Sequence, residues 1–154
     1  MMKYIKSLYR KIRGIPTIKV DPIGFIPMKG HADDACEDLR AATDYVVPGW
    51  GIKTIATYMR TEIPKGYFGD VRPRSGLSSD GLMLTNACGT IDAGYRGYWY
   101  ATFFNATPEP IHIKPGQKIV QVRFVKLDKY HYEYSNKLSD STRGSDGYGS
   151  TGSH

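Results

Sequence analysis

The sequence predicts an all-β protein in which many short strands are joined by turns. Seventeen Gly and nine Pro among 154 residues supply breaks between strands, and twelve Tyr supply aromatic residues that strands favour. Hardly any long polar helix pattern runs through the chain. A chain of this length makes one domain, or one domain with a tail, and is large enough to bury a core.

The first fifteen residues are predicted to form a short basic amphipathic helix. Ile5, Leu8 and Ile12 recur at helical spacing, with lysines and arginines around them. Such a helix suits a membrane surface or an organelle-targeting peptide, but most helices of this kind dock on their own domain, and we favour docking. We expect three segments: an N-terminal extension at 1–16, a β-sheet domain at 17–134 and a tail at 135–154.

Short apolar runs between Gly, Pro and acidic turns predict the strands in chain order. Pro22 and Pro27 interrupt the first two runs, so these are expected to be edge strands. A turn at Pro48-Gly49 is expected to join the third and fourth strands. The predicted strands are 17–20, 23–26, 45–47, 51–59, 82–84, 98–105, 111–113 and 117–127, with an outward continuation at 61–64.

Two of the predicted strands carry side chains that need partners outside their own strand. Residues 98–105 are apolar on both faces, with Tyr100 and Phe104 on one of them. In a domain this small, we expect one face to meet the core and the other a neighbouring subunit, which predicts a homo-oligomer. In the last strand, Gln121 and Arg123 interrupt an apolar face and need polar partners.

A glycine-punctuated turn at 89–97 carries one carboxylate and one aromatic ring in its middle. Glycine adopts positive φ angles and lets a backbone approach a ligand closely. We therefore expect a tight hairpin that presents Asp92 and Tyr95 together, in an arrangement typical of a binding or catalytic site.

Two further stretches contain groups suited to phosphate and metal. Residues 72–77 hold two guanidiniums, a hydroxyl and a glycine, which suit phosphate oxygens, although a plain surface turn explains this segment equally well. Residues 31–42 are rich in carboxylates, which hold Mg²⁺ beside a phosphate ligand, yet Asp-rich turns are more often structural. The net charge of +6 is scattered, and it favours an anionic nucleotide as much as DNA.

Several classes of protein are disfavoured. Cys36 and Cys88 are too few for a disulfide framework and lack zinc spacing. No apolar run is long enough to cross a membrane, and the first residues lack the apolar core of a secretory signal, so we expect an intracellular, cytoplasmic protein. No P-loop, dinucleotide fingerprint, zinc-protease motif or nucleophile elbow is present, and the four histidines have no ligand spacing.

From Ser135 onward the composition is dominated by Ser, Asp, Gly, Thr and Asn, which predicts a mobile tail. Arg143, Tyr148 and two hydroxyls among these glycines are suited to a phosphate and a base. We expect the tail to become ordered only when a ligand binds.

Taken together, five collinear segments resemble the motifs of the homotrimeric dUTPase family, and the resemblance extends from about residue 35 to residue 152. The segments are Asp38-Leu39-Arg40-Ala41, Pro73-Arg74-Ser75-Gly76-Leu77, Gly89-Thr90-Ile91-Asp92-Ala93-Gly94-Tyr95-Arg96-Gly97, Pro115-Gly116-Gln117-Lys118-Ile119-Val120-Gln121, and the tail from Arg143 to Gly152.

The resemblance implies a jelly-roll-like β-barrel, a homotrimer with active sites at subunit boundaries, and a flexible tail that closes over the site. It implies hydrolysis of dUTP to dUMP and pyrophosphate, with Mg²⁺ as cofactor and with neither nucleic acid nor a membrane required. Asp92 matches the general base that activates water against the α-phosphate, and Asp38 the carboxylate that reaches Mg²⁺ through water. Matches to phosphate-binding positions are Arg74, Ser75, Gly76, Gln121, Arg143, Ser150 and Thr151; matches to uracil- and deoxyribose-binding positions are Asn86, Gly89, Ile91, Tyr95 and Tyr148.

Some positions depart from the family pattern, and two rival functions remain. The departures are Asp34-Ala35-Cys36-Glu37 before the first motif, Gln117 for an acidic residue, Ala93-Gly94 after the base, and Tyr148 for Phe. One rival is dCTP deaminase of the same fold, whose catalytic glutamate is replaced here by Thr102. The other is a regulatory or binding protein on a dUTPase scaffold, which would use the basic helix or the trimer surface.

Overall fold

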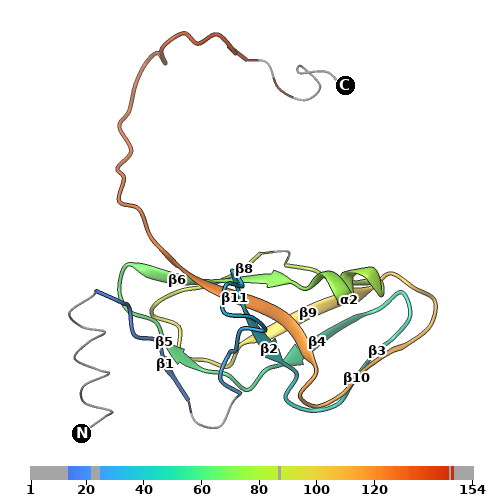
Figure 1. Ribbon diagram of the computed structural model, residues 1–154. Helices are drawn as coiled ribbons and strands as arrows, with labels where there is room; N and C mark the ends of the chain where they lie inside the picture. Colours follow the sequence, from blue (N-terminus) through green and yellow to red (C-terminus); the bar gives the residue numbers. More distant parts are fainter. Residues whose placement is uncertain (1–13, 22–24, 87, 146, 148–154) are drawn as a thin grey trace, which may run out of the picture.

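The computed structural model describes residues 14–21, 25–86, 88–145 and 147, and these form an all-β fold, as the sequence predicts (Figure 1). The described strands are short, and among the described residues one short helix lies between two of them. The elements are β1 (Lys19–Val20), β2 (Glu37–Arg40), β3 (Tyr45–Val47), β4 (Ile52–Ala56), β5 (Thr61–Glu62), β6 (Tyr67–Pro73), α2 (Ser75–Ser79), β7 (Leu82–Leu84), β8 (Gly89–Ile91), β9 (Tyr100–Asn105), β10 (Ile111–Ile113) and β11 (Lys118–Lys126).

The described strands pair antiparallel in four separate sheets. The largest has the order β2-β11-β6-β8, the next has the order β4-β9-β7, and the pairs β1-β5 and β10-β3 complete the set. No closed barrel is found among the described strands. The two larger sheets contribute side chains to one shared core, as Val120 and Val122 of β11 lie in the same buried cluster as Ala101 and Phe103 of β9.

Strand β9 shows the alternation that the sequence predicts. Ala101 and Phe103 are buried, whereas Tyr100 is about half exposed. Asn105 ends the buried row and is itself fully buried, because its side-chain amide donates to the carbonyl oxygens of Val47 and Glu109. The amide thus connects β9 to the end of β3 and to the loop after β9.

Some local predictions are wrong. Strand β4 ends at Ala56 rather than at residue 59, and Tyr58 just beyond it has a φ of 51°. No strand is found at 25–26, the described part of the predicted strand 23–26, although Met28 forms an isolated bridge with Asp38. The short helix α2 was not predicted from the sequence.

The hairpin expected around 89–97 is right in its flanking strands, since β7 and β9 pair antiparallel, but wrong in its tightness. Its first three residues form β8, which pairs with β6, whereas the strand after it, β9, pairs with β4 and β7. The turn therefore crosses from one large sheet to the other. It still presents Asp92 and Tyr95 together, but at a junction between sheets.

The outer face of the β4-β9-β7 sheet carries an exposed apolar row. The register aligns Ile52, Phe104 and Met83 across the three strands. Ile52 is 63% exposed and Met83 is 57% exposed. This row corresponds to the second apolar face that the sequence predicts for residues 98–105.

After β11 the chain leaves the sheets and runs outward (Figure 1). Every described residue from Leu127 onward is exposed, including Tyr130, Tyr132 and Leu138. Within the described part of the chain, no helix has the length and apolar character needed to cross a membrane.

Candidate functional site

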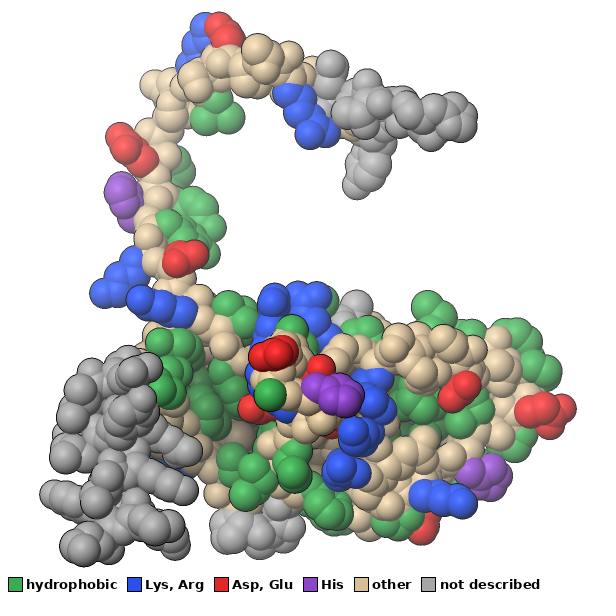
Figure 2. All heavy atoms as spheres, in the orientation of Figure 1, with side chains coloured by type: hydrophobic (Ala, Val, Ile, Leu, Met, Phe, Trp, Pro, Cys, Tyr) green, Lys and Arg blue, Asp and Glu red, His purple; other side chains and the backbone are tan. Residues whose placement is uncertain are grey.

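A polar pocket of about 460 Å³ lies between the loop before β2, the start of α2 and strand β11. It brings together four of the predicted site residues, because the register sets Asp38 of β2 opposite Gln121 of β11, and β6 delivers Arg74 and Ser75 at its end. Figure 2 shows acidic, basic and histidine side chains gathered over β2 and β11. Gly76 follows within α2 and is exposed.

The Asp38 carboxylate lies between two cations. Its Oδ1 is 2.8 Å from Nε of Arg74, and its Oδ2 is 2.7 Å from Nζ of Lys118. The side chain of Asp38 is mostly buried, so both pairs are shielded from water more than ordinary surface pairs are. A phosphate that enters this pocket has to compete with Asp38 for the same two cations.

Lys118 is a pocket residue that the sequence analysis missed. It belongs to the motif that ends at Gln121, but nothing in the spacing indicated that its ammonium group faces Asp38. The Arg74 guanidinium also donates to the Lys118 carbonyl at 3.3 Å, and the Gln121 amide donates to the Pro73 carbonyl at 2.9 Å. These bonds fix the three side chains relative to one another.

Gln117, one of the departures from the family pattern, has a structural role in the turn before β11. Its Oε1 accepts a hydrogen bond from the backbone N–H of Lys114 at 3.0 Å. The Arg40 guanidinium donates to the carbonyl of Gly116 in the same turn at 2.8 Å. Gln117 itself does not line the pocket.

Asp70 is a buried carboxylate at the centre of β6. Nε of Arg72 and Nε of Arg123 each lie 2.9 Å from its Oδ2. Burial alone would raise the pKa of Asp70, but the hydrogen bonds from Arg72 and Arg123 outweigh it and lower the pKa below its usual value. Arg123 thus has the polar partner that the sequence analysis required, and the two arginines at 72 and 74 serve different carboxylates.

A second pocket, of about 240 Å³, adjoins the turn at 89–97. The predicted site residues Ile91, Asp92 and Tyr95 line it, and so do residues that the sequence analysis did not assign to the site: Thr90, Tyr98, Trp99 and Tyr100. Residues 98–100 were predicted only as part of a strand, because they continue an alternating apolar and aromatic pattern. That pattern does not indicate that they lie at the edge of a pocket.

Hydrogen bonds fix the conformation of this turn. The backbone N–H of Tyr95 donates to the Asp92 carbonyl at 3.1 Å, and the Tyr95 hydroxyl donates to the Tyr98 carbonyl at 2.9 Å. Nη1 of Arg96 donates to the carbonyls of Ala93 and Tyr95. Gly97 is required because a Cβ there would clash with the Tyr95 ring.

The remaining predicted site residues lie outside both pockets or outside the described residues. Asn86 is exposed beside the buried Gly89, where an added Cβ would lie 3.1 Å from the Asn86 amide nitrogen. Arg143 lies in the exposed tail. Tyr148, Ser150, Thr151 and nearly all of the N-terminal extension at 1–16 are outside the described residues.

The two pockets have no lining residue in common. One offers a guanidinium, an ammonium, a hydroxyl and an amide, which are the groups that hold phosphate oxygens. The other offers an exposed carboxylate beside aromatic rings. These features define an all-β protein with one pocket suited to phosphate oxygens and a separate pocket that presents a carboxylate beside aromatic rings.

Comparison with known proteins specifies the family. The model of the dUTPase family matches residues 24–152, and the chain belongs to the dUTPase family. The deoxyuridine 5'-triphosphate nucleotidohydrolase of Corynebacterium glutamicum is 38% identical over 143 residues, which cover 92% of this chain and 96% of that protein. The enzyme of the same name from Thermobifida fusca is 37% identical over 138 residues, which cover 88% and 77% of the two chains.

Solved structures agree with this assignment. The dUTPase of Staphylococcus bacteriophage 80alpha with dUPNHPP superposes with a TM-score of 0.80 at 26% identity, covering 88% of this chain and 98% of that one. Its G164S mutant with dUpNHpp gives a TM-score of 0.78 at 26% identity, with the same coverage. The predicted membership of the dUTPase family is confirmed.

Proposed function

We propose that this chain hydrolyses dUTP to dUMP and pyrophosphate. The observation that carries the proposal is the polar pocket that contains Arg74, Lys118 and Gln121, in a chain that belongs to the dUTPase family and whose curated relatives are named for this activity. The test is to incubate the purified protein and Mg²⁺ with dUTP, dCTP, dTTP or UTP and to assay pyrophosphate and deamination. Release of pyrophosphate from dUTP alone is the expected result.

Asp92 is the proposed general base. Its side chain is exposed at the edge of the second pocket, and within the described part of the chain no group donates a hydrogen bond to it. A carboxylate in this state is able to accept a proton from water. The water oxygen then bonds to the α-phosphorus, the bond to the bridging oxygen breaks, and pyrophosphate leaves.

Arg74, Ser75, Lys118 and Gln121 are the proposed phosphate-binding groups. They neutralise the triphosphate, whose own charge repels a nucleophile. When phosphate oxygens replace Asp38 as partners of Arg74 and Lys118, the Asp38 carboxylate becomes available to another cation. Binding of substrate and release of Asp38 are therefore expected to occur together.

The first pocket also fits the expected Mg²⁺. Among the described residues, no three His, Cys, Asp or Glu side chains are grouped to hold a metal ion by themselves. Mg²⁺ at phosphate sites is usually bound by one or two carboxylates, several waters and the phosphates, and here Asp38, with Asp34 nearby in the pocket lining, supplies such carboxylates. The ion would neutralise charge on the triphosphate.

We propose a homotrimer of jelly-roll-like barrel domains with active sites shared between subunits. Two separate pockets on one chain support this arrangement, because a shared site would bring the phosphate pocket of one subunit to the Asp92 turn of another. The apolar row of exposed Ile52 and Met83 with the partly buried Phe104 between them is a suitable contact between subunits. The tail, with Arg143, Tyr148, Ser150 and Thr151, would close over the assembled site.

Selectivity is proposed to come from the second pocket. The Tyr95 ring would pack under the deoxyribose and leave no space for a 2′-hydroxyl, while the backbone near Asn86, Gly89 and Ile91 would pair with uracil. Cytosine has an amine where uracil has a carbonyl, so polar groups built for uracil would be mismatched in a buried site.

The two rival functions have weaker support. For the deaminase, the side chain at the position of the catalytic glutamate is Thr102, whose hydroxyl pairs with that of Thr54 at 2.9 Å. For a regulatory or binding protein, the basic extension lies almost wholly outside the described residues. A nucleotide substrate suits an intracellular, cytoplasmic location, and a nucleic-acid shift assay beside the turnover assay tests for a second role.

A further inference from the structure

Tyr58 has a backbone conformation that a bulky residue rarely adopts. Its φ is 51°, in the left-handed region that glycine occupies at little cost. The side chain is 41% exposed, so burial of the ring in the core does not explain why tyrosine stands here. Strained residues of this kind persist where their surroundings fix them, often near functional sites.

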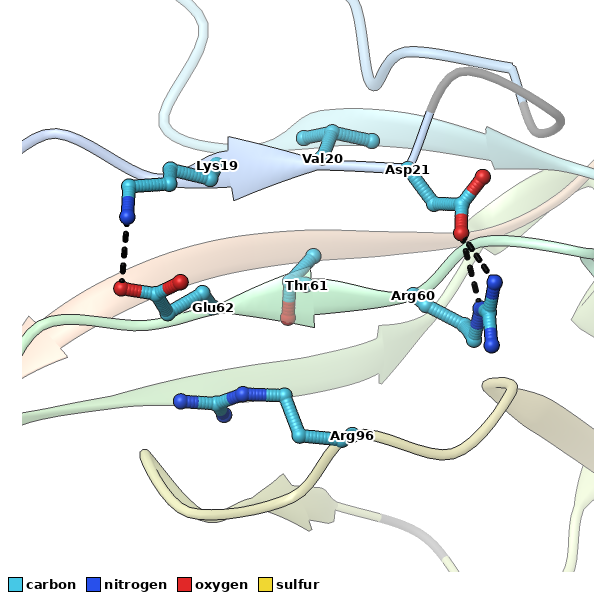
Figure 3. Close-up of a pocket in the computed structure, with 7 residues that line it drawn as sticks. All are labelled: Lys19, Val20, Asp21, Arg60, Thr61, Glu62 and Arg96. Atoms are coloured by element: carbon cyan, nitrogen blue, oxygen red, sulfur yellow. Dashed lines mark hydrogen bonds and ion pairs between the residues drawn. The ribbon is translucent and has the colours of Figure 1, made fainter.

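The Tyr58 ring contacts Tyr98, which lines the second pocket. The two rings meet edge to face, with centroids 5.8 Å apart and an interplanar angle of 63°. The Arg60 guanidinium also lies 4.9 Å from the Tyr98 ring centroid. Nε and Nη2 of Arg60 both donate hydrogen bonds to the carboxylate of Asp21, which follows β1 (Figure 3).

Backbone hydrogen bonds connect the same two segments. The N–H of Thr57 donates to the Trp99 carbonyl at 3.1 Å, and the N–H of Trp99 donates to the Met59 carbonyl at 2.9 Å. Residue 58 is therefore fixed opposite residues 98 and 99. A rotation of Tyr58 away from its strained conformation would break these bonds or separate the two rings.

Tyr98 in turn fixes the position of Tyr95. The Tyr98 carbonyl accepts the hydrogen bond of the Tyr95 hydroxyl at 2.9 Å. The ring of Tyr95 can be displaced only if this bond breaks or if Tyr98 moves with it. Tyr98 thus contacts Tyr58 through its ring, and through its backbone carbonyl it holds the ring proposed to lie under the deoxyribose.

We propose that Tyr58 is a positioning residue for sugar selectivity: its ring holds Tyr98, and through Tyr98 it holds Tyr95 against the deoxyribose. The proposal rests on the function proposed above. The proposed role of Tyr58 differs from a purely structural one, because its ring contacts Tyr98 in the wall of the second pocket while its backbone is strained.

The test compares Tyr58→Gly with Tyr58→Phe. Glycine adopts a φ of 51° without strain, so Tyr58→Gly removes the ring and relieves the backbone at the same time. Phenylalanine keeps the ring and removes the hydroxyl. The measurements are kcat and KM for dUTP and for UTP, together with the melting temperature.

We expect Tyr58→Phe to behave like the parent. In Tyr58→Gly, we expect the preference for dUTP over UTP in kcat/KM to narrow about threefold to tenfold, the range that an edge-to-face aromatic pair supplies. The melting temperature should not fall in parallel. Trp50→Gly is the matched control, since Trp50 has a φ of 52°, is 64% exposed and lines neither pocket.

The outcomes separate the two proposals. An active parent whose Tyr58→Gly variant keeps the parental dUTP preference overturns the role of Tyr58 and leaves the proposed function intact. An equal change in Trp50→Gly overturns it as well, because relief of strain alone would then explain the effect. A parent that releases no pyrophosphate from dUTP overturns the proposed function and the role of Tyr58 together.

Discussion

Replacement of Asp70 by asparagine should destabilise the protein in a pH-dependent manner. Asp70 is 6% exposed, and its carboxylate accepts two charged hydrogen bonds of 2.9 Å, from Arg72 and Arg123. A hydrogen bond to a charged group contributes about 1.5–3 kcal/mol. Both arginine side chains are more than 40% exposed, so water can hydrate the guanidiniums once the carboxylate is removed. We therefore expect Asp70→Asn to lower the free energy of unfolding by about 1–3 kcal/mol.

The pH dependence follows from the direction of the Asp70 pKa shift. The pKa in the folded protein is lowered relative to the unfolded chain, so the folded state favours the ionised form. The stability that Asp70 contributes is therefore fully present above the unfolded pKa, about 3.9, and is lost as the pH falls through the folded pKa. The Asp70→Asn variant lacks this contribution at every pH.

The assay is thermal unfolding, followed by circular dichroism from pH 7 to pH 3 at one protein concentration, since association affects the melting temperature. At pH 7 this loss of unfolding free energy corresponds to a melting temperature of Asp70→Asn roughly 2–12 °C below that of the parent, for a domain of this size. The difference between the two proteins should shrink below about pH 4. Asp44→Asn, at an exposed loop position, is the control. An equal difference at pH 7 and pH 3, or no difference at pH 7, would refute the reasoning.

Three further predictions concern the proposed reaction. Asp92→Asn should lower turnover about 10²- to 10⁴-fold. Nucleotide binding, measured with a non-hydrolysable analogue, should persist. Unchanged turnover would contradict the assignment of Asp92 as the general base. Truncation before Arg143 should abolish turnover and leave the proposed trimer intact, as measured by light scattering, whereas a monomeric product would show that the tail is structural. Lys118→Met should raise KM for dUTP about tenfold, with exposed Lys65→Met as control, and an unchanged KM would exclude the ammonium from phosphate binding.

Strand positions were predictable where the alternation of side chains is local. The buried Ala101 and Phe103 and the exposed Tyr100 of β9 follow from a period of two, which the chain itself encodes. The five collinear motifs supplied some residues of each pocket, such as Arg74 and Gln121 in the first and Asp92 and Tyr95 in the second, but not Lys118 or Tyr98. The sheet in which each strand pairs was not predictable, because pairing depends on distant strands. The hairpin expected around 89–97 is not tight for this reason, since β8 within it pairs with β6.

From the sequence it was predictable that a polar strand residue needs a partner on another strand, but not which residue that partner is. The sequence required a polar partner for Arg123 but did not identify Asp70, since the choice depends on the register that sets these two residues opposite each other. The end of β4 was missed for a different reason. Alternation continues through Tyr58, but its positive φ breaks the strand, and no side-chain pattern reports a backbone angle.

A bulge at the start of β11 explains how Lys118 reaches the first pocket. In a regular strand, residues 118 and 121 point to opposite faces, because their spacing is odd. Here the register with β2 slips between Lys118 and Val120, and the neighbouring Ile119 and Val120 are both buried. The extra residue changes the parity, so Lys118 and Gln121 line the same pocket and Lys118 pairs with Asp38. Strict alternation would turn Lys118 away from the pocket, so its place beside Asp38 depends on a backbone irregularity that the sequence pattern does not reveal.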